Sequence, residues 1–161
     1  MNLVSKLLPP GNVAADVAVS SKKRLFEHLA LMFENNHAIA TSVVFESLFA
    51  RERLGSTGLG QGVAIPHGRI KGLKDAIGAF VRLSAPVPFD APDGKPVTLV
   101  FALLVPEQAT ERHLQILSEL AQMFSDRALR EAMSSAPDAD ALHQLISTWQ
   151  PDAAGQRHAL A

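Results

Sequence analysis

Apolar residues recur with a helical period in two segments of the N-terminal third of the chain. The first segment lies between Ser20 and Asn36, where Ser20 or Ser21 can cap a helix. The second begins at Thr41 or Ser42 and ends before the glycines that start at Gly55. The residues predicted to face the core are Leu25, Phe26, Leu29, Met32 and Phe33 in the first helix, and Val44, Phe45, Leu48 and Phe49 in the second.

The C-terminal third of the chain predicts three further helices. They run from a Thr110 cap to about Ser125, from Arg127 to Ser134 and from Asp138 to Trp149. Their predicted core residues are Leu114, Leu117, Leu120, Ala121 and Phe124 in the first of the three, and Leu142, Leu145, Ile146 and Trp149 in the last. Residues 151–161 are small or polar, so we expect a flexible tail after a single domain of residues 1–150.

Strands are predicted between these two helical regions. Val63–Ile65 and Ala76–Leu83 are short apolar runs, and Val97–Val105 is apolar nearly throughout, as in a central strand covered on both faces. Ser84–Pro96 holds four prolines and the Asp93-Gly94 pair, which predict a connection with a turn and not a strand interior. This order predicts an α/β fold with a single domain and a central mixed β-sheet carrying helices on both faces.

Composition and charge exclude several classes of function. The 161 residues are 47% hydrophobic, which suits one domain with a full core. Fifteen basic residues against 16 acidic ones leave a net charge of -1, so we expect no nucleic-acid partner. The absence of cysteine excludes disulfides and thiolate chemistry. No apolar run approaches the roughly 20 residues of a membrane helix and no signal peptide is visible, so we expect a cytoplasmic protein that is not membrane-embedded.

The most unusual stretch of the chain is rich in glycine, with Gly55, Gly58, Gly60 and Gly62 close together. Such spacing lets backbone N–H groups turn toward an anion, and Ser56 and Thr57 add hydroxyl donors. The known nucleotide loops do not fit, because Val63 replaces the third glycine of a dinucleotide fingerprint and Gln61 the lysine of a Walker loop. A hydrolase elbow fails as well, since Ser56 directly follows Gly55. The stretch therefore predicts an oxyanion site of another kind.

A histidine ends this glycine-rich stretch. Pro66 biases Ile65 toward an extended backbone and Gly68 leaves space beside the ring, so His67 is expected at a strand end in a defined pose. A neutral imidazole is a good nucleophile near pH 7. Phosphoryl transfer asks a protein mainly for positioning and positive charge. His67 is thus a candidate phosphoryl acceptor, and we expect no metal and no cofactor at the site.

The pattern Arg51-Glu-x-x-Gly-Ser-Thr-Gly-x-Gly-x-Gly-x-Ala-Ile-Pro-His67-Gly, with Ser20-Ser-Lys-Lys-Arg and Phe101-Ala-Leu-Leu-Val-Pro106, resembles a known family. The family is that of the type 2 IIA domains of the bacterial phosphoenolpyruvate-dependent phosphotransferase system, most of all its nitrogen regulatory members. The resemblance implies that His67 takes a phosphoryl group from a small, nitrogen-type histidine phosphocarrier protein. It also implies that Arg51 and His113 belong to the same site, and that potassium transporters or sensor kinases are among the regulated targets.

Several of these assignments have a structural alternative. Arg51 and Arg53 stand where cations stabilise a helix C-terminus. His113 lies on an apolar helix stripe, although its place in the first turn of the helix suits an anion. Ser56 and Thr57 can form a hydroxyl turn; we predict that they contact the phosphoryl group together with Gly58 and Gly60.

Two functions other than a phosphorylatable regulator also stay open. One is a sugar-transport IIA component that passes its phosphoryl group to a IIB domain. The other is a binding protein whose His67 is never modified.

Overall fold

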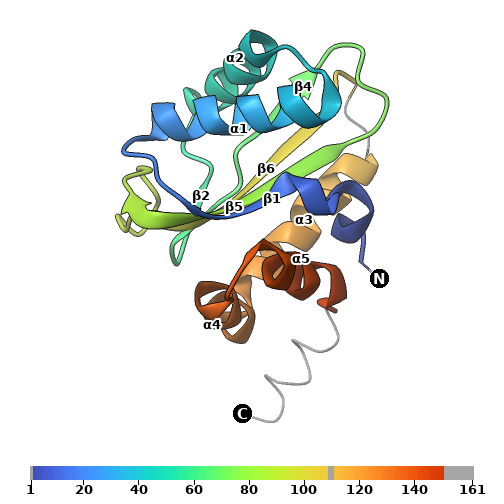
Figure 1. Cartoon of the computed structure of the whole chain (residues 1–161). Coiled ribbons are helices and arrows are strands. Elements are labelled where there is room, and N and C mark those ends of the chain that lie inside the picture. The colour runs from blue at the N-terminus through green and yellow to red at the C-terminus, as the bar shows by residue number, and fades with distance from the viewer. Residues whose placement is uncertain (1, 109–110, 151–161) are drawn as a thin grey trace.

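The computed structural model describes residues 2–108 and 111–150, and Figure 1 shows the arrangement of their elements. Two 3₁₀ turns open the chain, and α1 and α2 precede most of the strands, whereas α3, α4 and α5 follow them. In chain order the elements are η1 (Val4–Leu7), η2 (Pro10–Asn12), β1 (Val13–Val17), α1 (Lys22–His37), α2 (Thr41–Glu52), β2 (Gly58–Gly60), β3 (Val63–Ala64), β4 (His67–Ile70), β5 (Ile77–Val87), β6 (Val97–Pro106), α3 (Glu111–Ser125), α4 (Arg127–Ser135) and α5 (Ala139–Thr148). The flexible tail and the Thr110 cap expected from the sequence lie outside the described residues.

The strands form one mixed six-stranded sheet in the order β1-β5-β6-β3-β2, with β4 also paired to β6. β5 and β6 are antiparallel, as are β2 and β3, whereas β1 runs parallel to β5, and β3 and β4 run parallel to β6. β6 is buried over almost its whole length, which confirms the central strand predicted from its apolar sequence. The mixed sheet predicted from the sequence is confirmed too.

The sheet separates two hydrophobic cores, with α1 and α2 on one face and α3, α4 and α5 on the other (Figure 1). Neighbouring residues of β6 alternate between the cores, so that Leu103 packs with the α3 side and Leu104 with the α1 side. This alternation decides which helices each residue of the neighbouring β4 faces.

The helix caps follow ordinary side-chain chemistry. Ser21 accepts a hydrogen bond from the Arg24 N–H at the start of α1, which confirms one of the two serines proposed as its cap. Asp126 and Asp138 do the same for α4 and α5. The boundaries predicted for these helices agree with the structure to within about two residues, the usual uncertainty of helix ends.

The predicted core stripe of α3 was wrong at Leu114 and Ala121, although Leu120 and Phe124 are buried as predicted. In α3 the buried residues are Ile116, Leu120, Met123 and Phe124, whereas Leu114 is 66% exposed and Ala121 is exposed. Two overlapping stripes with helical spacing exist in this helix, and the sheet selects the one that includes Ile116.

β5 also runs further than predicted, through Pro86 to Val87. A break in its register with β6 between Arg82 and Val87 accommodates the proline. The short strands β1, β2 and β4 were not predicted, since three to five residues leave too little pattern to detect.

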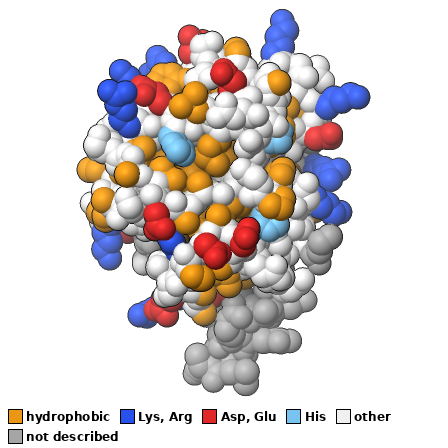
Figure 2. Space-filling model, in the orientation of Figure 1, with side chains coloured by type: hydrophobic (Ala, Val, Ile, Leu, Met, Phe, Trp, Pro, Cys, Tyr) orange, Lys and Arg blue, Asp and Glu red, His pale blue; other side chains and the backbone are white. Residues whose placement is uncertain are grey.

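The surface of the domain carries charges of both signs. On the face that Figure 2 shows, Lys and Arg side chains lie mainly around the rim and hydrophobic side chains gather nearer the centre. No single basic patch dominates this view, in keeping with the near-neutral net charge. Among the described residues, no helix has both the length and the apolar character needed to cross a membrane.

Candidate functional site

His67 is the first residue of β4, and one of its ring nitrogens is already engaged. Nδ1 lies 2.9 Å from the carbonyl oxygen of Ile65, two residues earlier. A carbonyl oxygen has no proton to give, so Nδ1 must be the donor of this hydrogen bond. In the neutral ring, Nε2 then carries the lone pair and is the nucleophilic atom.

The register of β4 determines the side of the sheet on which the ring lies. His67 pairs with Leu103 of β6, and the Leu103 N–H donates to the Pro66 carbonyl at 2.9 Å. Paired residues of neighbouring strands point to the same face. His67 therefore shares the α3 face of the sheet with Leu103, while Gly68 turns toward α2.

The ring is half-buried, and its surroundings shift its protonation equilibrium. Burial is the largest influence and lowers the pKa of His67 below the ordinary value of 6.5. The hydrogen bond to Ile65 and the charge of Glu52 act in the opposite direction, and the charge of Arg51 adds to the lowering. The net lowered pKa keeps the imidazole neutral, which is the form that a nucleophile requires.

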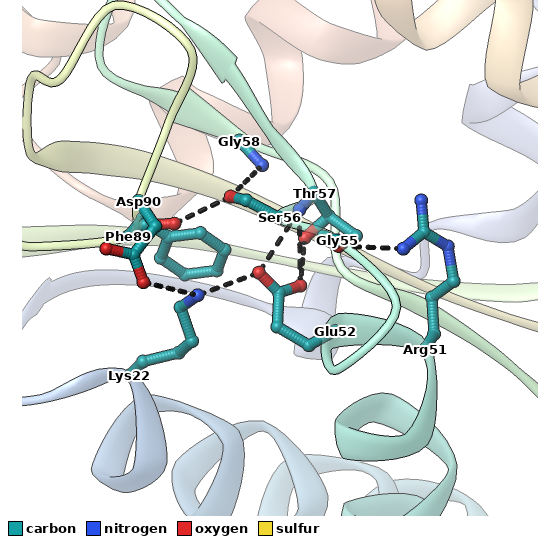
Figure 3. Close-up of polar contacts among 9 residues, drawn as sticks. All are labelled: Lys22, Arg51, Glu52, Gly55, Ser56, Thr57, Gly58, Phe89 and Asp90. Carbon is teal, nitrogen blue, oxygen red and sulfur yellow. Dashed lines mark hydrogen bonds and ion pairs between the residues drawn. The ribbon is translucent and has the colours of Figure 1, made fainter.

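Arg51, in the last turn of α2, contacts the glycine-rich loop. Its Nη1 donates to the Gly55 carbonyl at 2.8 Å, and Figure 3 shows the rest of the guanidinium turned away from Gly55. The charge of Arg51 influences the pKa of His67, so the sequence-predicted arginine does lie within electrostatic reach of the ring. Arg51 also lies in the last turn of α2, where a cation stabilises the helix dipole, so the alternative role as a helix-end cation stays open.

The two hydroxyls of the loop bond to the protein itself in this conformation. The Ser56 hydroxyl donates to the Phe89 carbonyl at 2.6 Å, and the Thr57 hydroxyl donates to Glu52 Oε2 at 2.6 Å (Figure 3). Thr57 is only 6% exposed. Both residues thus hold the loop in shape, and contact with a phosphoryl group stays a prediction for each.

Two glycines of the loop lie in the short strand β2, which packs closely against Ala91. Gly58 and Gly60 begin and end β2, which pairs antiparallel with β3, and the Gly58 N–H donates to the Ser56 hydroxyl oxygen at 3.1 Å. A Cβ on Gly58 would lie 2.8 Å from the Cβ of Ala91, so only glycine fits there. The close approach of this strand to residues 89–93 explains the glycine at this position; contact with an anion stays a prediction.

His113 lies in the first turn of α3, on the same side of the sheet as His67. It is half-buried at the edge of the α3 core stripe and lines a cavity of about 500 Å³. That cavity is also lined by Lys6, Lys74 and Arg112, but neither His67 nor Arg51 is among its lining residues. The structure thus brings the glycine-rich loop, which Arg51 contacts, next to the segment of His67, and the place of His113 in the same site stays a prediction.

Glu52 and Lys22 were not selected from the sequence, although they hold the centre of the loop. Glu52 accepts hydrogen bonds from both the N–H and the hydroxyl of Thr57, and Lys22 Nζ lies 2.9 Å from Glu52 Oε1 (Figure 3). The one available signal was the position of Glu52 directly after Arg51 and just before the glycines. Lys22, thirty residues earlier, lies in the Ser20-Ser-Lys-Lys-Arg segment of the family resemblance, but the sequence gave it no role.

Comparisons with known proteins agree on one family. Residues 6–149 match the family model described as phosphoenolpyruvate-dependent sugar phosphotransferase system, EIIA 2. A nitrogen regulatory protein of Pseudomonas aeruginosa is 46% identical over 144 residues, which cover 89% of this chain and 94% of the relative. A nitrogen regulatory protein homolog of Haemophilus influenzae is 40% identical over 147 residues, covering 89% and 90%.

A solved structure gives the same result. The crystal structure of the nitrogen regulatory protein IIA-Ntr from Neisseria meningitidis superposes with a TM-score of 0.83 at 51% sequence identity. The match covers 90% of this chain and 99% of that one.

Proposed function

The chain belongs to the EIIA type 2 family of the phosphoenolpyruvate-dependent phosphotransferase system, and within it we propose a phosphorylatable regulatory protein of the nitrogen type whose phosphoryl acceptor is His67. The observation that supports this most directly is the hydrogen bond from Nδ1 to Ile65, which leaves Nε2 as the nucleophilic atom. The identity of 46% and 51% to nitrogen regulatory proteins favours this branch of the family over a sugar-transport component.

The proposed reaction is a transfer between two imidazoles. The Nε2 lone pair of His67 forms a new phosphorus–nitrogen bond while the phosphorus–nitrogen bond of the donor phosphohistidine breaks and its electron pair returns to the donor ring. Nδ1 keeps its proton throughout, and the Ile65 carbonyl stabilises the positive character that the ring gains. No net proton transfer is needed, so the site requires position and positive charge and no general base.

Positive charge near the incoming group comes from Arg51 in this proposal. Its guanidinium bonds to Gly55 through one nitrogen, which fixes the side chain next to the loop. The other N–H groups of the guanidinium are donors for phosphoryl oxygens. In this proposal His113, in the first turn of α3 on the same face of the sheet, donates a further hydrogen bond to the phosphoryl group.

The consequence of phosphorylation is a change in binding. A phosphoryl group adds about 1.5 to 2 negative charges at pH 7, as on other phosphorylated side chains. In a protein of net charge -1 this alters the surface around His67 strongly. The donor is a nitrogen-type histidine phosphocarrier protein in the cytoplasm, and potassium transporters and sensor kinases are the classes of target that we carry over from the family.

The test is phosphorylation by a reconstituted relay of phosphoenolpyruvate, enzyme I and phosphocarrier. We expect one acid-labile phosphoryl group on the wild type and on His143→Ala, and none on His67→Ala. His143 is the matched control because its Nε2 also bonds to a backbone carbonyl, that of Leu8 at 2.9 Å. A His67→Ala protein that still takes up an acid-labile phosphoryl group would refute the assignment.

A second arm separates regulation from sugar transport. The phosphorylated protein is incubated with membranes, IIB domains and candidate sugars. The regulatory proposal predicts that the phosphoryl group is retained whatever sugar is present. Loss of the group that depends on one sugar would overturn the regulatory proposal in favour of the transport component.

A further inference from the structure

Glu52 carries a charge that is withdrawn from solvent at the end of α2. Its side chain is only 4% exposed, and its carboxylate accepts hydrogen bonds from Thr57 of the glycine-rich loop and from Lys22. The Thr57 N–H lies 3.1 Å from Oε1 and the Thr57 hydroxyl 2.6 Å from Oε2. A carboxylate is costly to bury unless such donors compensate it, so the arrangement is specific to this residue type.

Lys22 provides the compensating positive charge from another part of the chain. Its Nζ lies 2.9 Å from Glu52 Oε1, 3.8 Å from Asp90 Oδ2 and 4.4 Å from the centre of the Phe89 ring. Lys22 is the first residue of α1, and a cation there opposes the helix dipole. The stability of α1 therefore does not explain this lysine, whereas the charge of Glu52 does.

Together these contacts fix the loop residue by residue. Arg51 donates a hydrogen bond to the Gly55 carbonyl, and the Ser56 hydroxyl donates one to the Phe89 carbonyl (Figure 3). The Glu52 carboxylate accepts hydrogen bonds from the N–H and the hydroxyl of Thr57. The Thr57 carbonyl in turn accepts from the Ile65 N–H at 3.0 Å. Ile65 is the residue whose carbonyl holds His67, so one chain of hydrogen bonds runs from Lys22 through Glu52 and Thr57 to the segment that orients the ring.

We propose that Glu52 is a positioning residue for phosphoryl transfer, acting through Thr57 on the glycine-rich loop and on the Ile65 segment, with Lys22 as its counter-ion. The inference rests on the proposed function of His67. It assigns Arg51 and Glu52, which are neighbours in sequence, two different tasks. Arg51 acts on the phosphoryl group, and Glu52 holds the loop and the acceptor ring in relation to each other.

The test uses two substitutions of Thr57 in the full chain, one that is isosteric and removes the hydroxyl and one that keeps it. Thr57→Val removes the hydroxyl that Glu52 holds, whereas Thr57→Ser keeps it. Single-turnover transfer from the phosphorylated phosphocarrier is measured over a range of carrier concentrations. We expect Thr57→Val to lower the maximal rate constant by about tenfold and to leave the half-saturating carrier concentration unchanged. We expect Thr57→Ser to keep most of the wild-type rate constant.

Glu52 and Lys22 are tested by a double-mutant cycle in the same assay. Glu52→Gln removes the nearer and more buried of the two carboxylates that pair with the Lys22 ammonium, so we expect a larger loss than in Thr57→Val. Lys22→Met combined with Glu52→Gln removes both charges and should be faster than Glu52→Gln alone. If Glu52→Gln does not fold, the Thr57 pair still decides the question.

The outcomes separate this inference from the proposed function. If the wild type takes up no phosphoryl group, the proposed function fails and the inference with it. If the wild type is phosphorylated and folded Thr57→Val and Glu52→Gln transfer at its rate, the inference alone is overturned. A loss confined to the half-saturating concentration would also overturn it, because that result would place these residues in carrier binding.

Discussion

At the scale of single residues, the reactivity of His67 depends on which of its nitrogens is free. The Ile65 carbonyl holds Nδ1, and burial lowers the pKa of the ring, so the neutral form with Nε2 unprotonated is favoured. The hydrogen bond comes from the short segment Ile65-Pro66-His67, whose backbone brings a carbonyl beside a ring two residues later. The same three residues thus set the tautomer and the orientation of the ring.

Two neighbouring charges should move the pKa of His67 in opposite directions. Burial is the main cause of its lowered pKa, Arg51 lowers it further and Glu52 raises it. We therefore expect Arg51→Met to raise the pKa of His67 and Glu52→Gln to lower it. Because the acceptor must be neutral, transfer falls as the pH decreases through this pKa, and Arg51→Met moves that fall to higher pH.

The measurement for this pair is an NMR titration of the histidine ring nitrogens. The pKa of His28 is lowered by burial alone and serves as an internal control that neither substitution should change. A pKa of His67 that moves in the same direction in both variants would contradict the electrostatic account.

The residues of the site differed in how far the sequence could reveal them. His67 and Arg51 stand out because they lie in one short motif with the glycines. Lys22 could not be found, because its role depends on a contact with a residue thirty positions away. The hydroxyls of Ser56 and Thr57 were identified as donors, but their partners Phe89 and Glu52 depend on the folded loop.

At the scale of elements, β4 has to approach α2 closely at the residue after His67. A Cβ on Gly68 would meet the Ser47 hydroxyl and lie 3.0 Å from the Ser47 carbonyl carbon. Ser47 also donates to the Arg69 carbonyl at 2.8 Å, which joins α2 to β4 directly. The strand that begins with His67 is therefore held against the helix that ends with Arg51 and Glu52.

We expect Gly68→Ala to lower the free energy of unfolding by about 1–3 kcal/mol, because the added methyl group forces β4 and α2 apart. Gly11→Ala is the matched control, since nothing lies within 4 Å of a Cβ at that position. Urea unfolding of both variants measures the difference. Equal stability of the two variants would mean that the packing of β4 on α2 is looser than described.

The face of α3 that packs on the sheet gives a second prediction at this scale. Ile116 is 3% exposed and Leu114 is 66% exposed. We expect Ile116→Ala to cost about 2–5 kcal/mol and Leu114→Ala less than about 0.5 kcal/mol. Thermal and urea unfolding of the two variants tests this. A larger loss of stability in Leu114→Ala would mean that the face of α3 predicted from the sequence is the buried one.

The helices and strands differ in how well the sequence predicted them. The amphipathic helices and the almost wholly apolar β6 were predicted with nearly correct ends, because nine or more residues carry each pattern. The strands β1, β2 and β4, of three to five residues, were missed. The rotation of α3 could not be predicted, because Leu114 and Ile116 are equally apolar. What selects between such alternatives is the shape of the sheet, which only the fold defines.

At the scale of the whole molecule, the sheet separates two tasks. Helices α1 and α2 on one face supply Lys22, Arg51 and Glu52, which act at the glycine-rich loop. The other face carries His67 together with α3. The candidate site lies where these two layers meet, between the end of β3 and the start of β4. In the proposed reaction the phosphoryl group therefore contacts groups from both layers.

The central claim, that Nε2 of His67 receives the phosphoryl group while Nδ1 stays hydrogen-bonded to Ile65, is tested most directly by NMR of the histidine ring nitrogens before and after phosphorylation by the phosphocarrier. The account predicts phosphorus coupling to Nε2 of residue 67 and an unchanged Nδ1–H. Coupling to Nδ1 of that ring, or to another histidine, would contradict it.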